Sequence, residues 1–418
     1  RRSSDLIMAG HDISAGGLIT TLLEMCFSNM EGGMEISLNK IKEDDIIKIL
    51  FAENPGIVIQ VKDKHKEEVK KILEDAGIGY VKLGKPTEER HILVEKGDAT
   101  YQFGIDYLRD VWYSTSYLLD RKQSMNGCAK KRFENYKKQP LEFVFDKSFT
   151  GKLSQFGLNP DRRTPTGIKA AIIREKGTNG EREMAYMLYL AGFDVKDVTM
   201  TDLVSGRETL EDINFIVFCG GFSNSDVLGS AKGWAGAFLF NPKAKAALDN
   251  FYARKDTLSL GVCNGCQLMI ELNLINPDFT KKAKMLHNDS HKFESKFVGV
   301  TVPMNRSVMF GSLSGSKLGI WVAHGEGKFS LPYHEDKYNV VLKYSYDEYP
   351  GNPNGSDYSV AGLASPDGRH LAMMPHLERS CFPWQNAYYP ADRIKNDQIT
   401  PWMEAFVNAR KWIEMNKK

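Results

Sequence analysis

Short apolar runs alternate with helical periodicities through the second half of the chain. Residues 170–173, 193–198 and 215–218 are apolar enough for buried strands, and a further apolar run ends at Gly261. Between them, residues 181–190 and 243–254 have the spacing of helices with one apolar face. Strands that alternate with helices form parallel sheets covered on both faces. The pattern therefore predicts an α/β fold with a doubly wound, mostly parallel sheet.

The first 120 residues have a different pattern, which predicts an α+β domain. A Pro-Gly pair opens the alternating strand 57–61, and an amphipathic helix follows with Val69, Ile72 and Leu73 on its apolar face. The expected elements are the strand 57–61, the helix 64–76, the strands 78–83 and 91–95, and a helix from Asp106.

A polar motif precedes the first apolar helix of this domain. It runs His11-Asp12-Ile13-Ser14-Ala15-Gly16-Gly17-Leu18. The free N–H groups at a helix N-terminus can bind an anion. Alternatively, Asp12 or Ser14 caps a buried helix, and the composition favours this second interpretation.

Residues 121–166 differ from both flanking regions, because Lys and Arg are dense and prolines interrupt any regular pattern. We expect a connector that lies on the surface. The domain boundaries predicted from these changes are 1–120, 121–166 and 167–418.

Composition narrows the classes of function. The formal net charge is +2 and no Lys/Arg block resembles a nucleic-acid patch, so we expect no nucleic-acid partner. No apolar run is long enough to span a membrane. The six cysteines lack the spacing of a disulfide framework, which indicates a reducing, cytoplasmic setting. The abrupt start at Arg1-Arg2-Ser3-Ser4 suggests a piece of a longer polypeptide.

The clearest chemical motif is Gly261-x-Cys263-x-Gly265, at the junction of an expected strand and a helix expected from Leu268 onward. It is the cysteine version of the nucleophile elbow, whose flanking glycines allow a strained, sharp turn. The partial positive charge at the helix N-terminus favours the thiolate form of a cysteine there. An isolated cysteine would more often be a buried structural residue, but the two glycines favour a nucleophile.

Two other strand ends carry residues that fit a nucleophilic cysteine. Gly220-Gly221 follows an apolar strand, so the N–H of Gly221 can join that of Asn264 in an oxyanion hole. His376 and Glu378 follow the apolar run 371–374, and in an extended segment their side chains leave on the same face. The carboxylate would orient the imidazole as a base for Cys263.

Competing interpretations have less support. Cys263 and Cys266 match a Cys-x-x-Cys redox motif, although such motifs usually lie near the start of a domain. A zinc site would need further ligands beside His287 and His291. Neither a phosphate-binding Gly-x-x-x-x-Gly-Lys-Ser/Thr loop nor a dinucleotide fingerprint occurs. We therefore expect no cofactor on this chain.

With these motifs in place, the second domain resembles a class I, triad-type glutamine amidotransferase, with Cys263, His376 and Glu378 as its triad. The wider chain resembles the large-form phosphoribosylformylglycinamidine (FGAM) synthase family, with an AIR-synthase-like domain before the amidotransferase. The segments that carry this resemblance are 11–18, 174–184, 220–223, 261–267, 323–327 and 349–356.

The resemblance implies a glutaminase that passes ammonia to an ATP-dependent step in purine biosynthesis. It implies glutamine as substrate, with Gln267, Asn288 and Ser290 as substrate-binding residues. ATP, Mg²⁺ and the formylglycinamide ribonucleotide would bind mostly upstream of Arg1. Three positions depart from the family pattern, namely Ala15, Cys219 and Leu377. Two alternatives stay open: a free-standing thiol amidohydrolase or other amidotransferase, and a binding module whose triad is inactive.

Overall fold

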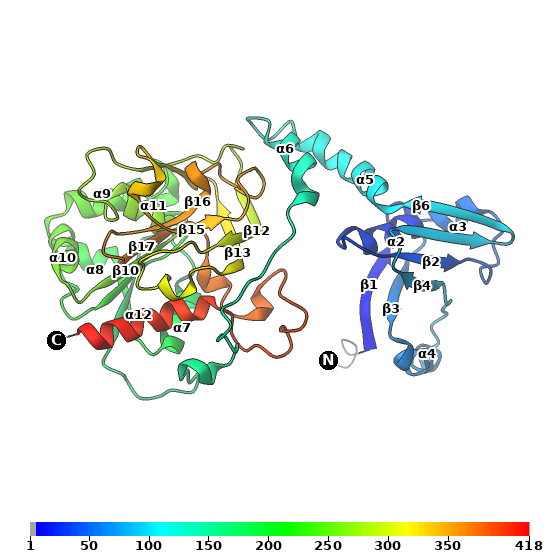
Figure 1. Cartoon of the computed structure of the whole chain (residues 1–418), viewed down its shortest axis with the longest axis horizontal. Coiled ribbons are helices and arrows are strands. Elements are labelled where there is room, and N and C mark those ends of the chain that lie inside the picture. The colour runs from blue at the N-terminus through cyan, green and yellow to red at the C-terminus, as the bar shows by residue number, and fades with distance from the viewer. Residues whose placement is uncertain (1–5, 418) are drawn as a thin grey trace. The chain divides into compact units, whose positions relative to one another are not determined.

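The computed structural model describes residues 6–417 and divides the chain into two compact units, Arg1–Asp120 and Arg121–Lys418 (Figure 1). The starting sequence 1–4, which suggested a piece of a longer chain, lies outside the described residues. Each unit has its own hydrophobic core, so each is described by itself.

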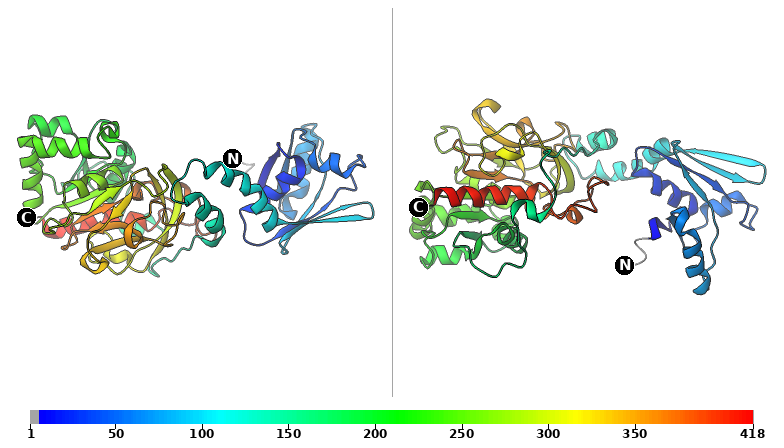
Figure 2. Two further views of the ribbon diagram at one scale, coloured as in Figure 1. Left: turned by 90° about the horizontal axis from the view of Figure 1, so that it is seen from above. Right: turned by 60° about the horizontal axis from the view of Figure 1, so that its bottom comes forward.

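The first unit contains two small sheets and four α-helices among its described residues. β1 and β3 pair antiparallel, and the other sheet has the order β4-β2-β5-β6. The β5–β6 hairpin projects from this unit in both views of Figure 2. The α+β prediction is confirmed. The bounds are β1 Ile7–Ile13, α2 Gly17–Phe27, β2 Gly33–Ser37, α3 Ile46–Phe51, β3 Gly56–Val61, α4 Lys66–Asp75, β4 Gly84–Thr87, β5 His91–Lys96, β6 Ala99–Gly104 and α5 Ile105–Asp120.

Two expectations for this unit, a strand at 78–83 and a side-chain cap on α2, were wrong. Residues 78–83 form no strand, because pairing with β2 begins only where the Leu83 carbonyl accepts from Ser37. The predicted amphipathic helix is present as α4, although Ile72 on its apolar face is 51% exposed. Neither Asp12 nor Ser14 caps α2. Its N-cap is Gly16, whose backbone N–H donates to the Glu53 carboxylate (2.9 Å). A carboxylate of the chain itself thus takes one amide that an anion would use.

The second unit is built on a nine-stranded sheet with the order β13-β12-β15-β16-β17-β10-β9-β7-β8. β8, β7, β9, β10 and β17 are mutually parallel and form the half predicted from the sequence. Every residue of β9 and of β10 is buried, which requires cover on both faces of the sheet. The predicted fold class is confirmed. The bounds of these strands are β7 Lys169–Arg174, β8 Asp194–Thr199, β9 Phe215–Phe218, β10 Leu258–Val262 and β17 His370–Met373.

The sequence analysis did not predict the other half of the sheet. Beyond β17 the strands pair antiparallel, and β11 and β14 form a separate two-stranded sheet. These strands have no helices between them, so they lack the alternation that identified the parallel half. Their bounds are β11 Lys284–Leu286, β12 Glu294–Thr301, β13 Lys317–His324, β14 Lys328–Ser330, β15 Asn339–Tyr344 and β16 Val360–Ala364.

The helices of the second unit pack in two groups. α7 lies beside α12, drawn in red in Figure 1, whereas α10 contacts α8 and α9. Their bounds are α6 Cys128–Asn135, α7 Glu181–Ala191, α8 Met200–Ser205, α9 Lys232–Phe240, α10 Pro242–Ala253, α11 Asn264–Glu271 and α12 Trp402–Asn416.

The segment 121–166, predicted as a connector, makes specific contacts within the second unit. Val144 forms a bridge with Lys317, and the Asn135 side chain donates to the Tyr349 carbonyl (3.0 Å). Phe149 belongs to the hydrophobic core of this unit. The segment is therefore attached along its length to the unit that follows it.

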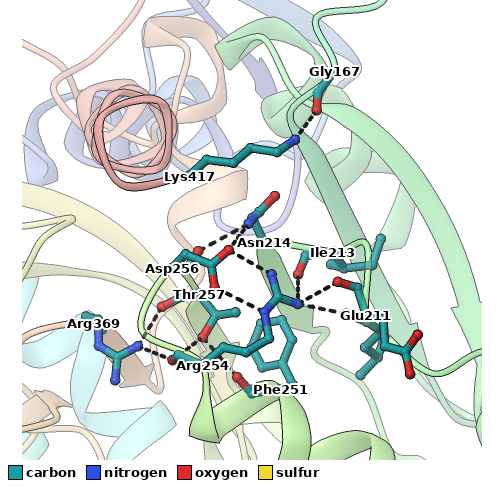
Figure 3. Close-up of polar contacts among 11 residues, drawn as sticks. Gly167, Glu211, Ile213, Asn214, Phe251, Arg254, Asp256, Thr257, Arg369 and Lys417 are labelled. Atoms are coloured by element: carbon teal, nitrogen blue, oxygen red, sulfur yellow. Dashed lines mark hydrogen bonds and ion pairs between the residues drawn. The ribbon is translucent and has the colours of Figure 1, made fainter.

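Two arginines form hydrogen bonds that link the loops at the amino ends of the parallel strands (Figure 3). All three guanidinium nitrogens of Arg254 donate, to the two oxygens of Asp256 and to the carbonyls of Leu210, Glu211 and Ile213. Arg369 donates to the carbonyls of Arg254 and Thr257. These contacts join the loops that lead into β9, β10 and β17.

Candidate active site

Cys263 occupies the sharp turn between β10 and α11. Its backbone is strained, with φ 52° and ψ −107°. A Cβ on Gly265 would lie 2.0 Å from the Phe218 carbonyl oxygen, and one on Gly261 would lie 2.5 Å from the Gly265 carbonyl oxygen. Both glycines are therefore required by close packing, as an elbow predicts. α11 begins at Asn264 rather than at Leu268, so the turn is tighter than expected.

His376 lies beside Cys263 at the end of β17. Its backbone N–H donates to the Trp321 carbonyl (2.9 Å). An ideal Cβ on Gly220 would lie 2.7 Å from Cε1 of His376 and 3.4 Å from Cβ of Cys263, so the two side chains flank the same point. The Cys263 thiol itself donates to the Ala323 carbonyl (3.5 Å). Nδ1 of His376 lies 2.6 Å from Oε1 of Glu378, and both side chains are 2% exposed. Leu377–Arg379 is a 3-10 turn, not the extended segment we expected. The two side chains nevertheless meet.

The charges around His376 favour its protonated form. Burial lowers the pKa of the imidazole, but the Glu378 carboxylate and Cys263 outweigh burial and raise that pKa to about 9. Oε2 of Glu378 is buried without a hydrogen-bond partner. The three residues therefore form a Cys–His–Glu arrangement in which the imidazole can hold or release a proton next to the sulfur.

Gly220 and Gly221 bring a backbone loop against this arrangement. A Cβ on Gly220 would lie 2.7 Å from Cε1 of His376, and Gly221 has φ 121° with no room for a side chain beside Thr178. In the described part of the chain the N–H of Gly221 has no hydrogen-bond acceptor. The N–H of Asn264 is in the first turn of α11, where helices leave amides unpaired. The oxyanion hole itself stays a prediction.

A cavity of about 210 Å³ opens beside Cys263. Its wall includes Gly221, Cys263, Gln267, Asp226, His324 and Glu326. It is large enough for a small amino acid, and the elbow lies at its wall. This is the carboxyl end of the parallel strands, where α/β sheets bind their ligands.

Comparison with known proteins matches each unit to a protein family. Residues 167–413 match a family described as the CobB/CobQ-like glutamine amidotransferase domain, and residues 1–96 match the AIR synthase related protein, C-terminal domain. The chain belongs to the glutamine amidotransferase family. The predicted resemblance of the second domain to a glutamine amidotransferase is confirmed.

Curated relatives extend the similarity over almost the whole chain. The probable phosphoribosylformylglycinamidine synthase, chloroplastic/mitochondrial, of Arabidopsis thaliana is 37% identical over 440 residues, which cover 99% of this chain and 30% of the relative. Phosphoribosylformylglycinamidine synthase of Homo sapiens is 38% identical over 442 residues, covering 97% and 32%. This amidotransferase chain thus spans about a third of the length of these relatives.

Among solved structures, "Structure of PurLQS from Thermotoga maritima" is 27% identical with a TM-score of 0.45, covering 60% of this chain and 99% of that one.

Of the three predicted substrate-binding residues, only one lies at the wall of the amidotransferase cavity. Gln267 lines the cavity, donates to the Glu326 carbonyl (2.7 Å) and accepts from Asn264 (2.9 Å). Asn288 and Ser290 are 0% exposed and are not part of the cavity wall. Asn288 donates to the His324 carbonyl (2.7 Å), and Ser290 donates to Glu294 (2.6 Å). Both hold the loops behind the wall.

Three residues of the cavity wall had no role in the sequence analysis. Asp226 lies in a polar loop without a recognisable motif, and the Ala323-His324-Gly325-Glu326-Gly327 segment was used only as family wording. The strands that lead to His324 are antiparallel, so periodicity did not bring it near the elbow. An unpaired polar atom in a cavity is visible only in the structure.

The alternative chemistries gain no support. Cys263 and Cys266 are both free, and burial raises the pKa of the Cys266 thiol well above its usual range. His287 and His291 stack with ring centroids 5.7 Å apart, and residues 6–417 contain no group of three or more side chains suited to a metal ion. The described helices include none with the length and apolar character of a membrane span.

Proposed function

We propose that this chain is the glutaminase portion of a phosphoribosylformylglycinamidine synthase. The observation that carries the proposal is the placement of His376 beside Cys263, with Glu378 2.6 Å from His376, where Cys263 lines a cavity that fits an amino acid. The similarity to named synthases supports the same substrate and a role in purine biosynthesis.

In this proposal the Cys263 thiolate attacks the carbon of the glutamine side-chain amide. A sulfur–carbon bond forms and the carbonyl oxygen becomes an oxyanion, which the N–H groups of Gly221 and Asn264 stabilise. His376 gives its proton to the amide nitrogen as the carbon–nitrogen bond breaks, so ammonia leaves and a glutamyl thioester remains. Water, deprotonated by His376, then cleaves the thioester and releases glutamate. Glu378 keeps the imidazole oriented and stabilises its charge.

The ammonia would be used outside this chain. An upstream part of the same synthase would bind ATP, Mg²⁺ and formylglycinamide ribonucleotide and convert the ribonucleotide to the amidine. Internal transfer keeps ammonia unprotonated, which matters because the ammonium ion is not a nucleophile. Six free cysteines suit a reducing compartment such as the cytoplasm, although the Arabidopsis relative is named chloroplastic/mitochondrial.

A glutamine-mimicking diazo-ketone tests the proposal, with the adduct located by peptide mass spectrometry. We expect alkylation of Cys263 in the wild type and none at that position in Cys263→Ser. Cys266→Ser is the matched control, because it removes the neighbouring thiol and should leave the labelling of Cys263 unchanged.

A reconstitution experiment then separates the synthase from a free-standing amidohydrolase. Adding the upstream part of the synthase, ATP and the ribonucleotide should couple glutamine hydrolysis to amidine formation. Hydrolysis that never couples would favour the free-standing enzyme. Absence of labelling, even with the upstream part and nucleotide supplied, would contradict both functions and leave a binding module with an inactive triad.

A further inference from the structure

Glu294 is a buried carboxylate that is not part of the cavity wall, and its side chain is 3% exposed. Its Oε1 accepts from the hydroxyls of Ser290 (2.6 Å) and Tyr349 (2.9 Å). Its Oε2 pairs with Nζ of Lys296 (2.6 Å) and with Nη2 of Arg132 (3.5 Å). A buried charge is costly unless it is paired, so these partners hold the carboxylate in one place. One side chain thus joins two loops, strand β12 and helix α6.

Glu294 lies opposite the strand end that contacts the nucleophile. β12 and β13 pair antiparallel, with Glu294 opposite His324 and Ser295 opposite Ala323. Directly opposite residues of such a pair project to the same face of the sheet. The Cys263 thiol donates to the Ala323 carbonyl (3.5 Å), and His324 lines the cavity. The position of β12 therefore sets the position of a carbonyl that contacts the sulfur.

The loop that Glu294 binds also holds the turn after β13. Ser290, which donates to Glu294, lies two residues after Asn288. The backbone N–H of Asn288 donates to the Gly325 carbonyl (2.9 Å). Its side-chain oxygen accepts from the backbone N–H of Gly327 (3.0 Å). Glu294 is therefore connected to the cavity wall by two routes, across the strand pair and through this loop.

Helix α6 takes part in the same network. The guanidinium carbon of Arg132 lies 5.0 Å from the centroid of the Tyr349 ring, which allows a cation–π contact. Asn135, on the same helix, donates to the Tyr349 carbonyl (3.0 Å). Just before the helix, the backbone N–H of Met125 donates to the Ser290 carbonyl (3.0 Å). α6 is therefore attached to both loops that donate to the buried carboxylate.

The network also places a positive charge near the two imidazoles. Burial lowers the pKa of His324 to about 3, and the charges of His376 and Lys296 act in the same direction. The pKa of His376 is raised to about 9, so this imidazole holds the proton beside Cys263. The ion pair with Glu294 fixes the Lys296 ammonium group. The arrangement thus keeps His324 neutral and leaves the proton to His376.

We propose that Glu294 is a positioning residue of the glutaminase site and that α6 supports it through Arg132. This inference rests on the proposed glutaminase function. Glu294 acts through the Ala323 carbonyl and His324, because it does not line the cavity itself. α6 follows α5, the last helix of the first unit, after residues 121–127. The connector is therefore part of the active conformation of the amidotransferase and not only a link between two units.

Two alkylating agents test the proposal: the glutamine-mimicking diazo-ketone and iodoacetamide, which needs no substrate site. The second-order rate of Cys263 alkylation by each is measured by mass spectrometry on the whole chain, with any upstream part it requires. In Glu294→Gln the diazo-ketone rate should fall about tenfold, because a misplacement of about 1 Å can cost up to 10²-fold. The iodoacetamide rate should change by less than about threefold, because it depends on the thiolate and not on the wall.

Tyr349→Phe is a milder variant, which keeps the ring and removes only the hydroxyl. The diazo-ketone rate should fall about threefold, the size of one hydrogen bond. Tyr389→Phe is its matched control, because Tyr389 donates to the Asp397 carboxylate (2.7 Å), which also accepts from Arg393 (2.8 Å). Glu208→Gln is the control for Glu294→Gln, since Glu208 is 6% exposed and also pairs with a lysine. Both controls should keep the wild-type ratio of the two rates.

A double variant tests the contribution of α6. Arg132→Gln should lower the diazo-ketone rate about threefold in the wild type and cause no further loss in Glu294→Gln, because residues in contact are not additive. Lys130→Gln is the control on the same helix, where the side chain is 70% exposed. It should leave both rates unchanged.

A wild-type ratio of the two rates in both Glu294→Gln and Tyr349→Phe would overturn the proposal. Equal falls in both rates would overturn it too, because they would show a structural role alone. Losses that add in the Arg132→Gln, Glu294→Gln double variant would overturn the role of α6. In each case wild-type labelling of Cys263 leaves the proposed function standing. Absence of wild-type labelling by the diazo-ketone would instead overturn the proposed function, and this inference with it.

Discussion

The two ends of the parallel strands differ in how their polar groups are used. At the amino ends, every guanidinium nitrogen of Arg254 donates to a carboxylate or carbonyl. At the carboxyl ends, Nε2 of His324, Oε2 of Glu378 and Oδ1 of Asp226 are buried without partners. The division is not absolute, because Nε of Arg162, near the start of β8, is also unpaired.

The amino ends of the strands therefore contribute mainly to stability, and the carboxyl ends mainly to the proposed chemistry. Satisfied buried hydrogen bonds stabilise a fold, whereas unpaired ones cost free energy and persist where a ligand or reaction needs them. The same strand, β17, has His370 at one end and His376 just beyond the other. Substitutions at the two ends should therefore affect different measurements.

The largest effect is expected from His376→Asn, which removes the base from the carboxyl end. Glutamine hydrolysis per folded molecule should fall by at least about 10³-fold, because no imidazole would take the thiol proton or protonate the leaving nitrogen. The measurement is glutamate release by the chain together with whatever upstream part it needs.

His334→Asn is the matched control for this variant. His334 and Asp336 have the same spacing as the site pair, with Nδ1 to Oδ1 at 3.1 Å, but their side chains are 77% and 65% exposed. Hydrolysis should stay at the wild-type rate. A loss below about tenfold in His376→Asn would show that the imidazole is not the base.

The next effect concerns the amino ends. Arg254→Ala removes both hydrogen bonds from Arg254 to Asp256, which keeps Asn214 as a donor, and three hydrogen bonds to carbonyls, so the free energy of unfolding should drop by about 2–4 kcal/mol. Glutamine hydrolysis per folded molecule should change by less than about twofold, because the network is remote from the cavity. Urea unfolding and glutamate release give the two numbers.

Lys417→Ala compares the part-buried, multiply bonded Arg254 with an exposed single hydrogen bond at the same end. Lys417 donates to the Gly167 carbonyl (2.7 Å) from an exposed position (Figure 3), so its loss should cost less than about 1 kcal/mol. Equal losses of stability in the two variants would contradict the account of the arginine network.

A smaller effect should appear in the pH dependence of stability. The pKa of His376 is raised to about 9, so its stabilising contribution is present below the unfolded value of about 6.5 and is lost as pH rises through 9. Burial and the charge of Arg369 lower the pKa of His370 to about 4, so its contribution is present above about 6.5 and is lost as pH falls through 4.

Urea unfolding between pH 4 and pH 10 measures the direction of both effects. Each histidine should change the free energy of unfolding by roughly a few kcal/mol at most. The stability advantage of the wild type over His376→Asn should shrink toward pH 10. Its advantage over His370→Asn should shrink toward pH 4. The reverse order would show that the two histidines have been assigned the wrong protonation states.

The sequence predicted the parallel half of this fold because its strands and helices alternate with clear periods. The elbow was predicted from Gly261 and Gly265, because a side chain at either position would clash with neighbouring backbone atoms. The antiparallel half, with His324, was missed because strands without intervening helices give no such alternation. Asp226 was not singled out because spacing along the chain does not report an unpaired oxygen in a cavity.

In the proposed reaction the Cys263 sulfur forms the bond to glutamine. Mixing the chain, with any upstream part it requires, with isotopically labelled glutamine, and quenching in acid, should trap the glutamyl thioester. We predict the label on the peptide containing residues 258–271, on Cys263 and not on Cys266, with none in Cys263→Ser. Label on Cys266 or Cys219, or hydrolysis that persists in Cys263→Ser, would contradict the account.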